Sequence, residues 1–500
     1  MTMPGRWPAW ARLLSAFAAG ALAVPGFGPL HLFPLPILGL AWLGVLVISS
    51  AHRRAAAACG FAFGLALFVL GVGWVYVALN RYGAMPAWIA APVTLLFASY
   101  LALFPAAAAW ASASIHVSRR WAILPGAWVL SEWVRGWLFT GFPWLALGYS
   151  QVPDSPLGGF APIAGVYGVS LALAGIAAAM AFGYSTGRIR ITAGLIAGTI
   201  ALGWIAGGIA WTQPAGEPVG VTLVQGNVAQ DLKFREDRLI ETLIAYSDAV
   251  TQATTPLVIL PETALPIPRH DLPPDYVDRL ARGTAARGAD LIVGLFEVDP
   301  PGSDRYFNSV VSLGTAASQS YRKHHLVPFG EFIPLKEILG PIIRDWLHVP
   351  LSDQTRGGAD QVPLSVAGQK VAMNICYEDV FGEEIIRQLP EATLMANVTN
   401  DAWYGESWAS RQHLQISQMR ALETGRWMLR ATNTGVTAAI DERGRIVARL
   451  PEFHRDQLIV QAQGRRGTTP YVSVGNAAAV IAAVLVLALS ILWRHEGRAP

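Results

Sequence analysis

The chain has 500 residues, of which 53% are hydrophobic and only 14% are charged, and its mean hydropathy is +0.39. Average proteins carry about 25% charged residues, so this composition excludes an ordinary soluble protein and favours one that lies largely in a membrane. The formal net charge of +3 does not indicate a nucleic-acid partner.

The apolar segments lie at the two ends of the chain. A helix that crosses the bilayer core needs ~20 apolar residues. The predicted spans are 9–27, 33–50, 56–79, 87–116, 121–138, 162–184, 190–211 and 475–493. The first span also has a signal-peptide look at Ala21-Leu-Ala23; an uncleaved helix is preferred, and the topology of the remainder is the same either way.

Arginines mark alternate loops of the predicted membrane region. They are Arg6, Arg12, Arg53, Arg54, Arg119, Arg120, Arg188 and Arg190, whereas the intervening loops hold only Arg81 and Asp154. Basic loops face the cytoplasm, so seven crossings place residues 212–474 outside and the eighth returns the tail to the basic side. The expected domains are therefore a membrane domain (1–211), an extracytoplasmic domain (212–474), and a C-terminal helix with a short cytoplasmic tail (475–500).

Two charged residues, Glu132 and Arg135, fall in or beside the fifth span. Their i,i+3 spacing puts them on one helix face, where they can pair. Charges inside a membrane are often functional, and a salt bridge at the outer interface is an equally good interpretation.

Residues 212–474 have the pattern of a large α/β domain, because short buried runs alternate with helical segments. The predicted strands are 219–225, 257–260, 291–296, 309–313, 371–375, 394–398 and 436–440. The predicted amphipathic helices are 235–251, 276–287 and 408–426.

Cys376 follows one of these strands directly, and the chain has only one other cysteine, Cys59, in an apolar span. Outside the cytoplasm an unpaired thiol is a liability unless it is used, which favours a nucleophile. The alternative is a buried free cysteine that acts as a small hydrophobe.

Acidic and basic residues occur at comparable positions upstream. Glu262 comes after the strand Leu257-Val-Ile-Leu and Pro261, while Lys323 and Glu331 flank a Pro/Gly turn. Strand ends are where active groups gather in α/β folds, although most such residues are solvated surface groups. No spacing of Cys, His or Asp suggests a metal site, and no cofactor is expected.

These motifs resemble a known family. Pro261-Glu262, Arg322-Lys323-His-His-Leu-Val-Pro-Phe-Gly-Glu331 and Ile375-Cys376-Tyr377-Glu378 match the Glu–Lys–Cys pattern of the nitrilase superfamily. Together with seven N-terminal spans and one C-terminal span, the chain resembles the apolipoprotein N-acyltransferase family of Gram-negative bacteria. Phe234 departs from the family pattern, which has a Trp at this position. Because Phe is also aromatic, a weaker stacking or pocket-wall role is still expected.

The resemblance implies a multi-span helical membrane domain plus an αββα sandwich, in the bacterial inner membrane with the catalytic domain in the periplasm. It implies Glu262 as base, Lys323 as cation and Cys376 as nucleophile, with Glu331, Glu378 and Tyr377 supporting. The expected reaction is ping-pong. A phospholipid acylates Cys376, and the thioester then acylates the α-amine of a diacylated apolipoprotein. A monomer is expected.

Several points stay open from the sequence. Glu331 and Glu378 could hold Lys323 or assist proton transfer. Phe234, Trp346, Trp403 and Tyr404 are candidates for substrate contact or for loops that cover the pocket, with ordinary core packing as the alternative.

Three other functions compete with acyl transfer. A membrane-tethered amidase hydrolysing a C–N bond would use the same three residues. A transporter is disfavoured by the few polar residues in the spans, and a scaffold protein leaves the Glu/Lys/Cys placement unexplained.

Overall fold

The computed structural model describes residues 4–233, 235–337 and 353–492. It divides into two compact units. The first comprises Met1–Gly73, Ala91–Ile209 and Ser473–Pro500, and the second comprises Trp74–Ala90 and Ala210–Val472. The segment Trp74–Ala90 therefore groups with the second unit. The boundaries expected from the sequence placed it in the membrane domain, residues 1–211.

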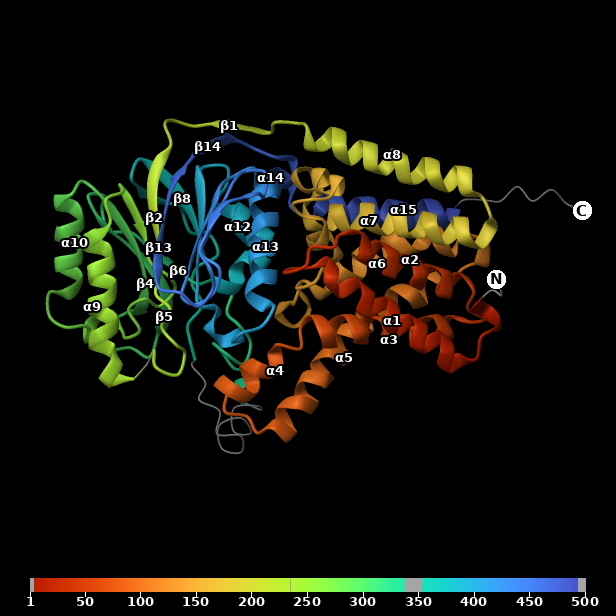
Figure 1. The fold of residues 1–500 in the computed structure, drawn as a ribbon, viewed down its shortest axis with the longest axis horizontal. Coiled ribbons are helices and arrows are strands. Elements are labelled where there is room, and N and C mark those ends of the chain that lie inside the picture. Colours follow the sequence, from red (N-terminus) through yellow and green to blue (C-terminus); the bar gives the residue numbers. More distant parts are fainter. Residues whose placement is uncertain (1–3, 234, 338–352, 493–500) are drawn as a thin grey trace, which may run out of the picture. The chain divides into compact units, whose positions relative to one another are not determined.

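The first unit is helical (Figure 1). Its long helices are α1 (Ala9–Ala23), α2 (Pro34–Ile48), α3 (Arg53–Gly71), α5 (Ala87–Ser112), α6 (Arg120–Arg135), α7 (Ala161–Thr186), α8 (Ile189–Gly207) and α15 (Ala477–Leu492). In the described residues, five helical segments have the length and apolar composition to cross a membrane, and α2 and α15 are shorter apolar helices. The chain is thus a multi-pass membrane protein.

The third predicted span is wrong at its C-terminal end. It was expected to reach residue 79, but α3 ends at Gly71. A short helix α4 (Val75–Val77) and a π-helical turn η3 (Ala78–Tyr82) follow instead, both in the second unit.

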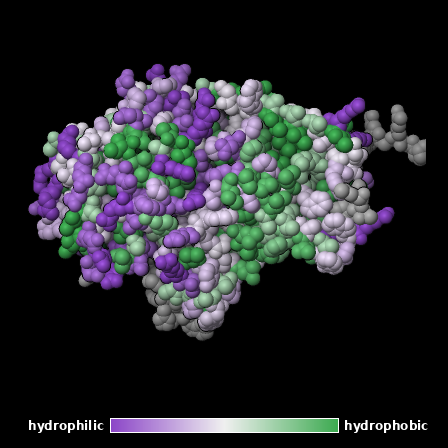
Figure 2. All heavy atoms as spheres, viewed as in Figure 1, coloured by the Kyte–Doolittle hydropathy of each residue, from purple (hydrophilic) through white to green (hydrophobic). Residues whose placement is uncertain are grey.

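Small residues allow close helix packing in the first unit, and large apolar residues cover its surface. A Cβ added at Gly20 of α1 would lie 2.0 Å from the Phe63 carbonyl oxygen of α3, so only glycine fits there. Leu96, Leu202 and Leu489 are each more than 60% exposed. Figure 2 shows such hydrophobic residues gathered over the surface of this unit, as lipid-facing helices require.

Glu132 and Arg135 of α6 both bind the irregular segment that follows this helix. Arg135 donates to the carbonyl oxygens of Phe142 (2.5 Å) and Trp144 (2.7 Å), and Glu132 accepts from the Leu147 N–H (2.8 Å). Backbone polar groups at membrane depth need partners inside the protein, so these charges satisfy a non-helical segment.

The second unit contains two six-stranded sheets packed face to face. One sheet has the order β13-β2-β3-β4-β5-β6 and the other the order β12-β11-β10-β9-β8-β7. The strands of the first sheet are β2 (Val219–Gln225), β3 (Leu257–Ile259), β4 (Asp290–Val298), β5 (Tyr306–Gly314), β6 (Ser320–Arg322) and β13 (Asp456–Ala462). Those of the second are β7 (Leu364–Val366), β8 (Gln369–Ile375), β9 (Leu394–Thr399), β10 (Met428–Thr432), β11 (Ala438–Ile440) and β12 (Ile446–Arg449).

Helices cover the outer face of each sheet, which gives four layers (Figure 1). Helices α9 (Glu236–Gln252) and α10 (Tyr276–Ala286) share one apolar cluster with the first sheet. Helices α12 (Gly382–Ile385) and α13 (Ala409–Thr424) share another with the second sheet. A third cluster, including Val221, Ile259, Met373 and Leu429, lies between the two sheets. The unit is therefore an αββα sandwich, as the resemblance implied.

The predicted strands all occur, with small shifts at their ends, but β6, β7, β10, β12 and β13 of the two sheets were not predicted, and β10 and β13 show why. β10 is fully buried yet carries Arg430 and Thr432, and β13 is half-exposed at the sheet edge beside β2. Neither strand has the apolar pattern that identifies a buried strand in a sequence.

The chain enters and leaves the sandwich through one ribbon. β1 (Thr212–Pro214) pairs antiparallel with β14 (Arg465–Gly467), so Thr212 lies opposite Gly467. The short helix α14 (Pro470–Val474) follows.

Candidate active site

Cys376 occupies a sharp turn at the end of β8. The last pair in the parallel ladder of β8 with β9 is Ile375 with Val398, and Cys376 then begins the short 3-10 helix η10 (Cys376–Val380). Its φ of +53° lies in the left-handed region, which costs a non-glycine residue about 1–3 kcal/mol. The surroundings must hold this conformation, which is characteristic of a functional residue.

Lys323 and two carboxylates form an ion cluster in the second unit. The Lys323 Nζ lies 2.7 Å from Glu331 Oε1 and 3.5 Å from Glu262 Oε1. Lys323 and Glu262 are buried, and Glu331 is nearly so. A charged lysine at this depth requires such partners.

The positions of Glu262 and Lys323 are linked by Asn308 of β5. Its side-chain N–H donates to Glu262 Oε1 (2.8 Å), and its backbone carbonyl accepts from the Lys323 N–H (2.8 Å). Sequence analysis missed this residue; the only signal was a polar residue at the start of a buried strand.

A glycine allows Glu262 to reach this position. The turn Pro261–Thr263 passes directly over Gly294 of β4, where an added Cβ would lie 2.6 Å from the Pro261 carbonyl oxygen and 2.9 Å from the Glu262 Cα. Any side chain at 294 would push the turn away from the sheet.

The charges set the protonation of Cys376 and Lys323. Burial and Glu262 raise the pKa of the Cys376 thiol well above its ordinary value, although Lys323 lowers it. Burial alone would lower the pKa of Lys323, but Glu331, Glu262 and Cys376 together raise it. The resting pair is therefore a neutral thiol and an ammonium ion, so the thiol would need a base to act as a nucleophile.

Glu378 holds the backbone of the site rather than the lysine amine. It accepts from the N–H groups of Ile375 (2.6 Å), His324 (2.6 Å) and His325 (3.1 Å), and from the Tyr321 hydroxyl (3.1 Å). Burial raises its pKa to about 7, although these donors lower it. Its contacts thus join the Cys376 turn to the Lys323 loop, while Glu331 contacts the lysine amine itself.

Tyr377 is buried in an aromatic cluster. Its ring lies 5.2 Å from Phe381 and 6.0 Å from His325, both edge-on. The ring therefore packs beside the turn that carries Cys376.

A second buried lysine, Lys233, lies beside Glu262, and sequence analysis did not single it out. Its Nζ donates to the Glu262 carbonyl oxygen (3.1 Å). Burial lowers the pKa of Lys233 to about 8, although Glu262 and Cys376 oppose this. The site thus has a second amine that is charged or neutral depending on pH near 8.

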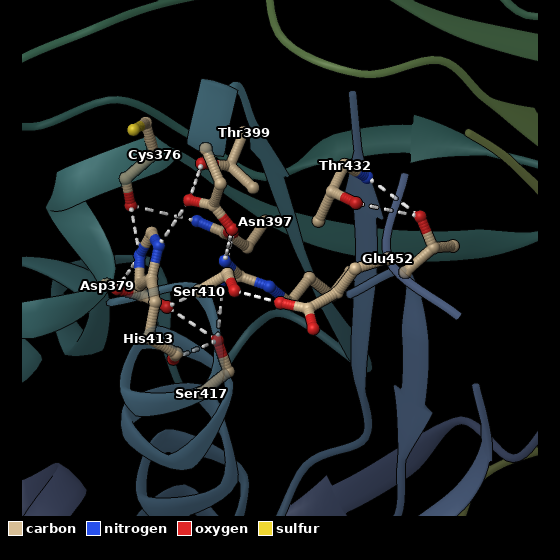
Figure 3. A network of polar contacts seen from close by, with 12 residues as sticks. Cys376, Asp379, Asn397, Thr399, Ser410, His413, Ser417, Thr432 and Glu452 are labelled. Atoms are coloured by element: carbon tan, nitrogen blue, oxygen red, sulfur yellow. Dashed lines mark hydrogen bonds and ion pairs between the residues drawn. The ribbon is translucent and has the colours of Figure 1, made fainter. Parts of the chain in front are cut away.

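A network of buried charges lies against the backbone of Cys376 (Figure 3). It consists of Asp379 of η10, Asp401 of η12 (Asp401–Tyr404), His413 of α13 and Arg430 of β10. No role was predicted for these four residues from the sequence.

The remaining candidates differ in position. Tyr404 packs edge-on against Trp74 (4.6 Å between rings) and Trp403 against Tyr82 (6.2 Å), so both contact the segment Trp74–Ala90. Phe234 and Trp346 lie outside the residues that the structure describes. Among the described residues, no cluster of His, Cys, Asp or Glu could hold a metal ion.

The chain is similar to known proteins over nearly its whole length. The family model for the apolipoprotein N-acyltransferase N-terminal domain matches residues 19–179, and the carbon-nitrogen hydrolase model matches residues 220–471. A protein from Nitrosomonas europaea, named apolipoprotein N-acyltransferase, is 49% identical and covers 97% of this chain and 98% of its own. A protein of the same name from Chromobacterium violaceum is 46% identical, with 97% and 95% covered. Among solved structures, an amidase of the nitrilase superfamily from Nesterenkonia is 16% identical with a TM-score of 0.36, covering 51% of this chain and 94% of its own.

Proposed function

The chain belongs to the apolipoprotein N-acyltransferase family, and we propose that Cys376, Glu262 and Lys323 perform its acyl transfer in two steps joined by a thioester. The observation that carries this proposal is the ion cluster of Lys323 with Glu331 and Glu262, whose charges act on a thiol at a strained turn.

In the first step, the Cys376 sulfur attacks the ester carbonyl of a membrane phospholipid. Glu262 takes the thiol proton as the S–C bond forms, because the resting thiol is protonated. The Lys323 ammonium stabilises the oxyanion of the tetrahedral intermediate. When the intermediate collapses, the C–O bond breaks, and Glu262 returns the proton to the leaving lysophospholipid.

In the second step, the α-amine of the N-terminal diacylglyceryl-cysteine of an apolipoprotein attacks the thioester. The new C–N bond forms, the C–S bond breaks, and the amine's proton passes through Glu262 to the sulfur. The amide product is more stable than the thioester, so the sequence runs toward N-acylation. Water would hydrolyse the thioester, and burial of the site limits this side reaction.

The supporting residues have distinct roles in this proposal. Glu331 keeps Lys323 charged and prevents it from forming a close ion pair with Glu262. Glu378 fixes the backbone next to Lys323 and next to Cys376. In the same proposal, Trp403 and Tyr404 belong to a loop that borders the substrate entrance. The catalytic domain, residues 212–474, lies in the periplasm.

The experiment is intact-mass analysis of the full-length protein reconstituted with phospholipid. We expect a fatty acyl adduct on Cys376, with an equal amount of lysophospholipid, and its transfer to a diacylated lipopeptide. Cys376→Ala should form no adduct, and Glu262→Gln and Lys323→Ala should fold but lose acylation. An active protein that releases no lysophospholipid would instead be an amidase, and near-wild-type transfer by any of the three variants would overturn the role assigned to the substituted residue.

A further inference from the structure

The Cys376 carbonyl accepts hydrogen bonds from two side chains beyond the end of the β8 ladder. Asn397 Nδ2 of β9 donates to it at 3.1 Å, and His413 Nε2 of α13 lies 3.3 Å away. Both side chains are fully buried. The carbonyl of the strained residue is thus bound from two different elements, and Figure 3 shows both partners beside it.

His413 lies between two carboxylates. Its Nδ1 is 2.8 Å from Asp401 Oδ1, and its Nε2 is 2.8 Å from Asp379 Oδ1. Since ionised carboxylates and carbonyls only accept hydrogen bonds, both ring nitrogens must carry protons. Burial and Arg430 lower the pKa of His413, but the two aspartates outweigh them and raise it. His413 is therefore an imidazolium ion.

Arg430 completes the cluster and fixes the orientation of Asn397. Its guanidinium contacts Asp401 Oδ2 (2.9 Å) and Asp379 Oδ2 (3.3 Å), and it donates to Asn397 Oδ1 (2.8 Å). With its oxygen bound to Arg430, Asn397 must present its amide N–H groups to the Cys376 carbonyl and to Asn374 Oδ1 (2.6 Å). Two cations and two anions balance, so the buried cluster is neutral.

We propose that His413 and Asn397 are positioning residues that hold the Cys376 backbone in its left-handed conformation through its carbonyl oxygen, and so aim the sulfur at the scissile carbonyl. This inference rests on the proposed function of Cys376 as nucleophile. Arg430, Asp379 and Asp401 act one step further away, because they set the charge of His413 and the orientation of Asn397.

A cluster that only stabilises the fold would behave differently in an experiment. Removing one partner from a buried ion cluster destabilises the fold, so the loss of a purely structural cluster would lower the melting temperature and leave the rate of the folded molecules unchanged. If the residues position Cys376, their loss should lower the maximal rate of acyl-enzyme formation in folded molecules. The phospholipid concentration that gives half of the maximal rate should stay the same.

The test measures single-turnover formation of the acyl-enzyme in the full-length protein reconstituted with phospholipid, for His413→Gln and Asn397→Ala. Asn397→Ala removes one donor to the Cys376 carbonyl and leaves all four charges in place. Below the melting temperature we expect each variant to be slower by roughly 10- to 100-fold, the loss expected from misplacing a reacting atom by about 1 Å.

The matched control is Gln418→Met, because Gln418 is a buried polar residue of the same helix whose side chain binds the Gly444 carbonyl instead. It should lower the melting temperature and keep the wild-type rate. Wild-type rates in folded His413→Gln and Asn397→Ala would overturn the inference, and Asn397→Ala alone decides if His413→Gln does not fold. Retained transfer in Cys376→Ala would instead refute the proposed function.

Discussion

Lys323 is held by two carboxylates at different distances, and the difference separates their roles. Glu331 is the nearer partner at 2.7 Å and is anchored by the Val327 N–H (2.8 Å), whereas Glu262 is 3.5 Å away and bound by Asn308. In the proposed mechanism, Glu262 can act as the base because Glu331 is the closer partner of the Lys323 ammonium. The sequence supplied all three residues but not this division.

Glu331→Gln should lower kcat by roughly 10- to 100-fold, a typical cost of weakening electrostatic support for an oxyanion. Without the nearer carboxylate, Lys323 pairs with Glu262 and blocks the base. KM for the lipopeptide should change little in a steady-state transfer assay. Glu391→Gln, an exposed residue paired with Lys370, is the control and should keep wild-type kcat. An unchanged kcat in Glu331→Gln would contradict this division of roles.

The variant Lys233→Met tests whether the pKa of Lys233 is lowered, through the pH dependence of the protein's stability to unfolding. The pKa of Lys233 falls from 10.5 to about 8 on folding, so between these pH values the unfolded chain binds more protons and wild-type stability rises with pH. Below pH 8 the folded protein bears the full cost of the buried charge, up to about 3 kcal/mol.

The melting temperature of Lys233→Met relative to wild type should therefore be highest below pH 8, and the difference should fall as the pH rises to 10.5. Thermal unfolding in one detergent across this range provides the measurement. A difference that does not vary with pH would mean that Lys233 keeps an ordinary pKa.

At the scale of elements, the apolar strands were predictable and the polar buried elements were not. α13 was expected to be an amphipathic helix, yet its residues Gln412, His413, Gln415 and Arg420 are all buried. Gln412 is paired with Trp74, and His413 with Asp379 and Asp401, all outside the helix, and no local pattern reveals such partners. Arg430 is a similar case, because its charge interrupts the apolar run by which β10 could have been recognised in the sequence.

The position of the three main candidates just after strands explains why the sequence pointed to them. Glu262 follows β3 and Cys376 follows β8, each where an apolar run stops, and Lys323 follows β6. Asn397 and His413 lie within elements, where a polar residue gives no positional signal of its own, and Asn308 is marked only by its place near the start of β5.

Gly294→Ala should damage the site through one element. The added methyl group collides with the turn that carries Glu262, so we expect a loss of about 1–3 kcal/mol in stability and more than roughly tenfold in activity. Gly283→Ala is the control, because nothing lies within 4 Å of its added Cβ on α10. That variant should be active and up to about 1 kcal/mol more stable. Equal activity of the two variants would show that the turn tolerates displacement.

At the scale of the whole molecule, the distribution of arginines predicts the orientation in the membrane. Arg12 and Arg120 reinforce it structurally, because both donate to backbone carbonyls at the C-terminal end of α2: Arg12 to Leu46 (2.8 Å) and Arg120 to Ser50 (2.6 Å). These two arginines therefore also cap the C-terminal end of α2.

Labelling of one introduced cysteine at a time tests this orientation. Lys370→Cys lies on the second unit and Arg188→Cys between α7 and α8, and both positions are exposed. In spheroplasts, a membrane-impermeant thiol reagent should label Lys370→Cys, and it should label Arg188→Cys only after lysis. The reverse pattern would put Cys376 on the cytoplasmic side. The native Cys59 and Cys376 are buried, so the unsubstituted protein provides the background.

The ribbon of β1 and β14 brings the first and last residues of the sandwich together, with Thr212 opposite Gly467. A domain whose ends meet can be inserted into a host chain without disturbing either fold. A coding sequence for a soluble α/β domain could therefore be inserted between those for α8 and α15, and the inserted domain and the flanking helices could each still fold.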